Sequence, residues 1–396
     1  ICNLSNIISM RHAILLITAV MMTACCHGTF EVDNTIFDFT KRETLGLQRF
    51  PEMKTYTVFS PIEGENHYNH AASVIVFKDN IYVQWQTSKS DEDAPDTHVV
   101  YARSFNGNLW SKPQKLTDSD TLSHITTSGG WHVTKDSLIA YINVWKNDTT
   151  VKGGRSGYTM YRSSANGTQW SEMRPVLTAE GDTLRGIIEQ DTRALPNGRL
   201  LTSVHTMPGL IVKPYYTDDK SGVRGWTMGQ MENLPMNSEK SSRELEPSWY
   251  IRNDDAIVMV MRDQSSTYKK LASVSHDNGN TWTTPVIVDT PDSRSKQCAG
   301  NLPNNKGAYM IYNPSKDKER LPLCIVMSED GYMFDKAYLL RSSSHDDLPT
   351  MRQIGKYKRM GYSYPKSTTY KNKIYVSYAT NKEDIEITVL IFRYGS

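Results

Sequence analysis

Cysteine is scarce in this chain. Five cysteines occur in 396 residues, and three of them, Cys2, Cys25 and Cys26, fall close to the N-terminus. Only Cys298 and Cys324 remain further along, and no Cys/His spacing resembles a zinc site. Two alternatives stay open for this pair: one disulfide of an exported protein, or two buried free thiols. A disulfide-dense scaffold is excluded.

An excess of charge of one sign is also absent. The chain has 45 Lys and Arg against 43 Asp and Glu, a net charge of +2, and no run of Lys and Arg forms a basic stripe. A nucleic-acid partner is therefore not expected. Helical periodicity of useful length and low-complexity linkers are missing as well, which favours an all-β chain.

A long apolar run occurs only near the N-terminus. Residues 13–22 are apolar and follow Met10-Arg11-His12, and the run is too short to span a membrane. This pattern predicts a leader over residues 1–27, and Ala24-Cys25 resembles a bacterial lipoprotein cleavage site. We therefore expect export to the periplasm or cell surface of a bacterium, with membrane contact only through a lipid on Cys25.

The most informative stretch is residues 275–282, which read Ser-His-Asp-Asn-Gly-Asn-Thr-Trp. The Asp and Asn side chains can cap their own backbone and the glycine can take a positive φ, so a tight turn at a hairpin tip is expected. Weaker copies recur at residues 104–110, 164–170 and 328–334. The aromatic residues that close these turns, together with a Trp that lacks a clean turn, fall 60, 56, 56 and 52 residues apart, at Trp110, Trp170, Trp226, Trp282 and Phe334.

This period with strands inside it predicts a single-domain β-propeller over residues 28–396. Six inner-strand segments can be counted, at residues 71–86, 130–145, 189–205, 246–262, 300–313 and 364–378. The strand expected over residues 54–59 would complete the last blade and close the ring, which removes the free sheet edges.

The inner strands of a propeller gather around one axis, so polar residues that open them should converge on one mouth. These imidazoles, carboxylates, phenols and one guanidinium suit acid–base work on an acidic sugar. The expected catalytic residues are His70, His132, His205 and Tyr364, and the expected substrate-binding residues are His67, Trp85, Trp131, Glu189, Glu246, Arg262, Gln297 and Tyr362. The acidic run Asp91–Asp93 would rim the mouth or hold a cation.

The recurring turn resembles the Asp-box of sialidase-like propellers. Glu246 followed by Pro247, together with Arg262, resembles the Glu and Arg pair of those enzymes, and residues 361–364 resemble the segment with their catalytic Tyr. The Arg-Ile-Pro signature of true sialidases is missing, and residues 68–72 stand in its place. Without a visible arginine triad, sialic acid cleavage is not expected.

Residues 68–70, 82–85 and 91–95 resemble instead the opening blade of exported bacterial propellers that act on uronic-acid glycans. That branch includes exo-α-L-rhamnosidases that remove rhamnose capping glucuronic acid, and ulvan and rhamnose-glucuronate lyases. The resemblance implies seven blades and an oligosaccharide substrate that contains uronic acid. We expect a monomer without a cofactor, and whether a calcium ion is bound stays open. The resemblance also implies a His of the first blade at the glycosidic bond, for which His70 is the first choice and His67 the reserve.

Two other functions stay open. In a lyase, Arg262 or a His would neutralise the uronate, and a Tyr or His such as Tyr364 would remove the C5 proton. In a protein without catalysis, the same propeller would only bind glycans.

Overall fold

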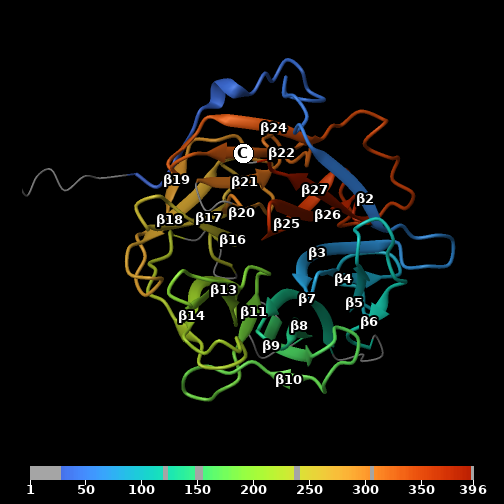
Figure 1. Ribbon diagram of the computed structural model, residues 1–396, viewed down its shortest axis with the longest axis vertical. Helices are drawn as coiled ribbons and strands as arrows, with labels where there is room; N and C mark the ends of the chain where they lie inside the picture. The colour runs from blue at the N-terminus through green and yellow to red at the C-terminus, as the bar shows by residue number, and fades with distance from the viewer. Residues whose placement is uncertain (1–27, 119–123, 148–154, 236–240, 304–306, 394–396) are drawn as a thin grey trace, which may run out of the picture.

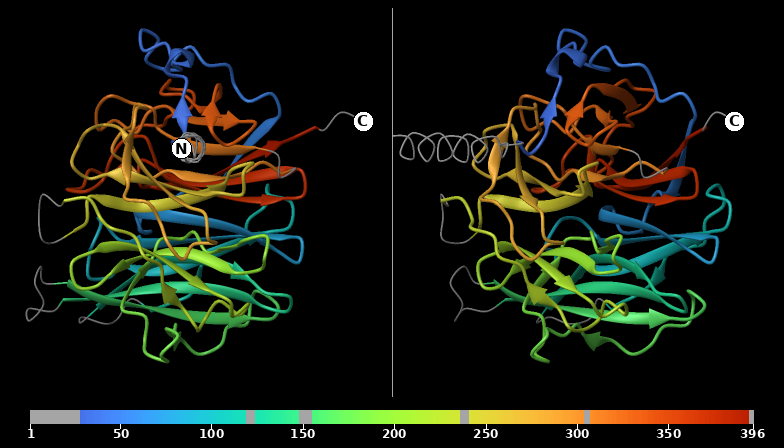
Figure 2. Two further views of the ribbon diagram at one scale, coloured as in Figure 1. Left: turned by 90° about the vertical axis from the view of Figure 1, so that its left-hand side faces the viewer. Right: turned by 60° about the vertical axis from the view of Figure 1, so that its left-hand side comes forward.

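The computed structural model describes residues 28–118, 124–147, 155–235, 241–303 and 307–393. Viewed down its shortest axis, the chain forms a ring of sheets around a common centre (Figure 1). Seen from the side, the strands of neighbouring sheets stack as layers (Figure 2). The all-β propeller expected from the sequence is confirmed.

Blades 1 to 3 follow one another along the chain, each beginning with its innermost strand. Their strands are β3 (Tyr68–Phe77), β4 (Asn80–Ser88), β5 (His98–Ser104) and β6 (Gln114–Lys115); β7 (His124–Val133), β8 (Leu138–Asn147), β9 (Arg155–Ser164) and β10 (Arg174–Pro175); and β11 (Gly186–Ile188), β12 (Arg193–Ala194), β13 (Leu200–Thr206), β14 (Ile211–Thr217) and β15 (Thr227–Met228).

Blades 4 to 6 repeat this plan. Their strands are β16 (Glu244–Ile251), β17 (Ile257–Asp263), β18 (Lys270–Ser275) and β19 (Val286–Val288); β20 (Cys298–Asn301), β21 (Ala308–Tyr312), β22 (Leu323–Ser328) and β24 (Lys336–Arg341); and β25 (Tyr362–Tyr370), β26 (Lys373–Thr380), β27 (Asp384–Ile391) and β2 (Met53–Phe59).

The N-terminal strand closes the ring, as predicted. β2 pairs antiparallel with β27, so the first strand of the propeller completes the last blade. The expectation of seven blades is wrong, since the described residues form six. The length left over lies in residues 28–52, where β1 (Glu31–Val32) pairs with β23 (Met333–Phe334) and the 3-10 helix η1 (Asn34–Ile36) follows. This segment packs on blades 4 and 5 through Phe30 and Phe37 and adds no further blade.

The four Asp-box turns share one hydrogen-bond pattern. In residues 275–282, the Gly279 amide donates to the Ser275 hydroxyl (2.9 Å), the Thr281 amide donates to Asp277 (2.9 Å), and the Trp282 indole donates back to Gly279 (3.0 Å). The hydrogen bond from the glycine amide to the serine hydroxyl recurs in the other three copies, at 2.8–2.9 Å. The predicted turns are confirmed, and each closes a blade at its outer strands.

Apolar side chains fill the spaces between neighbouring blades. Val74 and Val83 of blade 1, for example, pack with Val389 of blade 6 in one cluster. Cys298 and Cys324 lie in this core as free thiols, so the disulfide alternative is wrong. Burial raises the pKa of the Cys298 thiol to about 11.

Candidate functional site

The first residues of the inner strands are bent toward the channel by irregular pairing. The register shifts between residues 70 and 73 of β3, 128 and 130 of β7, 245 and 248 of β16, and 363 and 366 of β25. Ala71, Glu246 and Tyr364 at these bulges have positive φ values of 53–55°. Bulges re-aim side chains, and left-handed backbone at non-glycine residues persists only where its surroundings hold it.

A cavity of about 240 Å³ lies where these strand starts meet. Five residues predicted from the sequence line it, which are His70, Glu189, His205, Glu246 and Tyr364. The geometric expectation that distant segments converge on one mouth holds for these five. Their roles in binding or catalysis stay predictions.

Tyr364 and Glu246 form the centre of the cavity. The Tyr364 hydroxyl donates a short hydrogen bond to the Glu246 carboxylate. Arg262 donates through Nη1 to Glu246 Oε2 (3.1 Å) and to the Tyr364 oxygen (3.4 Å). A phenol, a carboxylate and a guanidinium from blades 4 and 6 thus form one hydrogen-bonded group.

The charge states of this group are set by burial and by its neighbours. Burial and the Glu246 charge hold the Tyr364 pKa well above its usual 10, so the phenol keeps its proton. Burial is the largest influence on Glu246 and would raise its pKa, but Arg262, the Tyr364 hydrogen bond and Lys296 together outweigh it, so the pKa is lowered. An ionised carboxylate therefore accepts the hydrogen bond of a neutral phenol.

His70 lies against Tyr364, with ring centroids 4.3 Å apart. Its side chain is buried, and neither ring nitrogen has a hydrogen-bond partner among the described residues. Burial, followed by the charges of Lys382, Arg320 and Lys296, holds the imidazole pKa well below 6.5. His70 is thus a neutral imidazole with both nitrogens available to a ligand.

A second buried group forms the opposite wall. His205 Nδ1 lies 2.9 Å from Glu189, and its Nε2 accepts the Glu246 amide hydrogen (3.2 Å). Lys296 donates to Glu189 (2.7 Å) and to Gln190 (2.8 Å). Because both ring nitrogens of His205 are engaged, this residue holds the backbone of Glu246 in place.

The sequence reasoning missed three cations, two beside Tyr364 and one whose charge acts on His70. The Arg320 guanidinium lies 5.2 Å from the Tyr364 ring centroid and Lys296 Nζ lies 5.7 Å from it. Lys382 pairs with Glu92 of the β4–β5 loop (2.5 Å). Lys296 stands next to Gln297 at the start of the fifth inner strand, so the rule that found the other residues could have found it. No sequence signal marks Arg320, which lies in a loop.

The acidic run contributes to the rim, one of the two outcomes expected for it. Glu92 and Asp93 both line the cavity, and Asp93 has a positive φ of 62°. Among the described residues, no cluster of three or more His, Cys, Asp and Glu side chains is arranged to hold a metal ion.

Trp131 and His132 lie at the wrong end of the channel for the predicted site. They stand at the end of β7 and not at its start, because the strand begins at His124. Both line a separate hollow of about 740 Å³, where the inner strands end. There the His132 ring bonds the Lys220 carbonyl (3.0 Å), and the Trp131 indole donates to Ser73 (2.7 Å).

Four other predicted residues do not line the cavity either. The Trp85 ring is buried against Phe59 at 5.7 Å. The Tyr362 hydroxyl donates to the Ser342 carbonyl (2.8 Å) inside blade 6, and Gln297 donates to the Glu246 carbonyl (3.0 Å). The His67 carbonyl accepts from Lys358 (3.0 Å). Successive side chains of a strand point to opposite faces, so residues such as these point between the blades. The sequence pattern did not distinguish them from residues that point into the channel.

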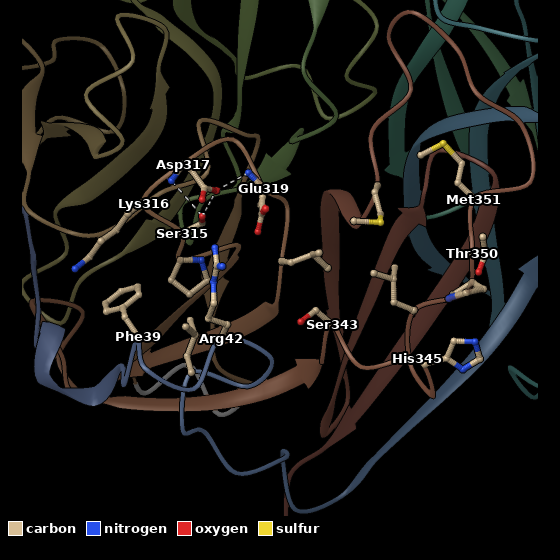
Figure 3. Close-up of a pocket in the computed structure, with 16 residues that line it drawn as sticks. Phe39, Arg42, Ser315, Lys316, Asp317, Glu319, Ser343, His345, Thr350 and Met351 are labelled. Carbon is tan, nitrogen blue, oxygen red and sulfur yellow. Dashed lines mark hydrogen bonds between the residues drawn. The ribbon is translucent and has the colours of Figure 1, made fainter.

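A larger hollow of about 790 Å³ borders the loops that carry Arg320 and lead to Tyr364 (Figure 3). Phe39 and Arg42 of the N-terminal segment form one side and His345 lies on the other. Asp317 is engaged there by hydrogen bonds from Ser315 and from the Glu319 amide. Unlike the smaller cavity, it contains no phenol or imidazole paired with a carboxylate, so we place the candidate site in the smaller one.

The leader and Cys25 lie outside the described residues. Within the described part of the chain, no helix has the length and apolar character needed to cross a membrane.

Comparison with known proteins agrees with the fold. A family model described as BNR repeat-like domain matches residues 79–376. No curated protein matches the chain.

Solved structures of similar fold have low sequence identity. A protein of unknown function from Dyadobacter fermentans DSM 18053 is 17% identical with a TM-score of 0.65, and the match covers 87% of this chain and 100% of that one. The Hadza microbial sialidase Hz136 is 12% identical with a TM-score of 0.64, over 85% of this chain and 68% of that one. The intramolecular trans-sialidase from Ruminococcus gnavus is 10% identical with a TM-score of 0.59, over 85% and 98%.

Proposed function

The chain belongs to the family of BNR repeat-like domains, and from that membership and the cavity we propose that it is an exported glycoside hydrolase acting on glycans that contain an acidic sugar. The observation that carries this proposal is the hydrogen-bonded group of Tyr364, Glu246 and Arg262 on the cavity. Arg320 and Lys296 beside Tyr364, and Lys382 near His70, add positive charge to the cavity, which suits a sugar carboxylate.

In the proposed reaction, Tyr364 is the nucleophile and Glu246 its base. The phenol proton passes to the Glu246 carboxylate while the tyrosyl oxygen bonds the anomeric carbon and the glycosidic C–O bond breaks. The Asp93 carboxyl group on the rim gives a proton to the leaving oxygen. Water then attacks the anomeric carbon and breaks its bond to the Tyr364 oxygen. The proton of the water passes to Asp93, and the proton held by Glu246 returns to Tyr364.

At the finer level, we propose that the bond cleaved joins a terminal α-L-rhamnose to glucuronic acid. The resemblance of the first blade supports this substrate. His70 of that blade lies on the cavity, and neither of its ring nitrogens bonds any residue that the structure describes. In this version His70 acts at the glycosidic bond, helped by the uronate of the substrate itself. The surrounding cations hold that uronate whether Tyr364 or His70 acts at the glycosidic bond.

Elimination at a uronate is the second candidate. A phenol and a neutral imidazole beside several cations are also the groups that would remove a C5 proton and stabilise the carboxylate. Cleavage of a sialoside is a third outcome to measure, since Arg320 adds a second guanidinium to Arg262.

One assay separates these functions. Purified protein is incubated with a rhamnose-capped glucuronide, a polyuronate and a sialoside, and free rhamnose, unsaturated uronate absorbance and free sialic acid are followed. Free rhamnose without new absorbance supports the proposal, while absorbance supports elimination. Binding of these glycans without any product supports a binding protein and refutes the hydrolase.

A further inference from the structure

A groove between blades 6 and 1 opens at the ends of the inner strands, away from the cavity. It has a volume of about 470 Å³, which is in the range of ligand pockets. The β3–β4 turn, the β25–β26 turn and the Asp-box turn of blade 1 form its walls. None of the residues that line the catalytic cavity lines this groove.

Strand register shows how the groove is built. Lys373 pairs with Ile391, and Lys54 and Tyr375 both pair with Val389. Residues directly opposite each other share a face of the sheet. Val389 and Tyr375 pack toward blade 1 in the core, so Lys54 and Lys373 stand on a face that is otherwise apolar.

The groove has an excess of positive charge. Lys371 is paired with Asp79 (2.9 Å), which also accepts from the Tyr370 hydroxyl (2.7 Å). Lys54 and Lys373 have no carboxylate partner in the part of the chain that the structure describes. The groove thus has three ammonium groups and one carboxylate next to the apolar face of the sheet.

Phe105 adds an exposed aromatic ring to this groove. Its side chain is 72% exposed, at a position of the Asp-box turn where the other three copies have His276, Ala165 and Glu329. The turn does not need an aromatic residue there, and large exposed apolar side chains next to a groove mark binding surfaces. Aromatic rings stack on the apolar faces of sugars, and ammonium groups pair with their carboxylates.

We propose that this groove is a second glycan site, which binds an acidic polysaccharide chain at a distance from the bond that is cleaved. The choice of an acidic chain rests on the proposed function, and the groove itself supports it through its unpaired lysines and Phe105. A polymer held here keeps its other end available to the cavity.

The test is binding of polygalacturonate, a linear polyuronate, with dextran as the neutral probe. In the variants Lys54→Ala/Lys373→Ala and Phe105→Ala, the affinity for polygalacturonate should fall about tenfold and several-fold respectively, and the wild-type affinity should fall with added salt. Lys112→Ala, which removes another exposed lysine, should bind like the wild type. Melting temperatures of all variants confirm that they fold.

The outcomes separate this inference from the proposed function. Activity on a small rhamnosyl glucuronide should be unchanged in the groove variants, because the cavity is intact. An Arg320→Ala variant should keep most of its polygalacturonate binding. Wild-type affinity in the Lys54→Ala/Lys373→Ala variant, equal binding of dextran, or no binding by the wild type overturns the second site, whatever the enzyme assay gives.

Discussion

At the scale of single residues, the cavity holds a neutral phenol against an ionised carboxylate. The Glu246 carboxylate accepts a hydrogen bond from the Tyr364 hydroxyl and another from Arg262. The backbone of Glu246 is held by the His205 ring at its amide and by Gln297 at its carbonyl. Such support fixes a reactive pair without help from the substrate.

If Tyr364 is the nucleophile that we propose, its replacement by Phe should lower kcat by about 1,000-fold or more with little change in melting temperature, because the hydroxyl is lost while the ring remains. Tyr362→Phe is the matched control. It removes a buried hydroxyl that bonds Ser342 away from the cavity, so it should keep activity and lose about 1 kcal/mol of stability. A Tyr364→Phe enzyme with near-wild-type kcat would exclude the tyrosine mechanism, and a loss seen only in His70→Ala would favour the imidazole version.

The titration of His70 gives a prediction at the same scale. Burial and then Lys382 lower its pKa, so the imidazole stays neutral at pH 6.5 and becomes protonated only as the pH falls further. Lys382→Met removes a nearby cation and should move this protonation to higher pH. The measurement is the NMR titration of the His70 ring, or the acid limb of the rate profile. Lys112→Met should leave it unchanged, and a shift to lower pH would contradict the electrostatic account.

At the scale of elements, the Asp-box turns depend on glycine for two separable reasons. Gly167 has a φ of 74°, and a Cβ added there would lie 2.0 Å from the Tyr82 hydroxyl oxygen. Gly181, in the turn between β10 and β11 and outside the Asp-boxes, has a φ of 88° and open space around it. A comparison of alanine substitutions at Gly167 and Gly181 therefore separates the cost of backbone strain from the cost of steric contact.

Gly181→Ala should cost about 1 kcal/mol, the strain of an alanine in the left-handed region. Gly167→Ala should cost about 3 kcal/mol, since the buried Tyr82 ring must also move. Urea unfolding of both variants measures the difference. Equal costs would mean that the turn adjusts without displacing Tyr82.

At the scale of the whole molecule, the N-terminal strand holds the ring closed. β2 and β27 form six residue pairs, and Val58 joins the core shared by blades 6 and 1. Without it, β27 becomes a free sheet edge, which favours association with other chains.

Deletion of residues 28–60 should lower the melting temperature by about 10 °C or more and produce oligomers, because it opens the ring. Deletion of residues 28–50 keeps β2 and should retain a monodisperse protein with a smaller loss. Size-exclusion chromatography and calorimetry provide the comparison. A monodisperse 28–60 deletion would show that closure by β2 is dispensable.

Much of this architecture follows from local sequence. The serine, aspartate or asparagine, and glycine of each Asp-box determine their own turn through short-range hydrogen bonds, so four turns, six inner strands and the closing strand could be placed from the chain alone. Six repeats could be counted in the sequence, but the resemblance favoured seven blades, for which the chain has room only if the repeat period tightens.

The sequence by itself determined the repeated turn, the order of the strands and the residues that open most inner strands, because these depend on neighbours a few positions apart. Only the tertiary structure decided that Arg320 faces Tyr364, that Lys296 and not Gln297 enters the cavity, and that Trp131 and His132 lie at the far end of the channel. Those contacts join residues far apart in the chain, and a shift of one residue in a strand reverses the side to which a side chain points.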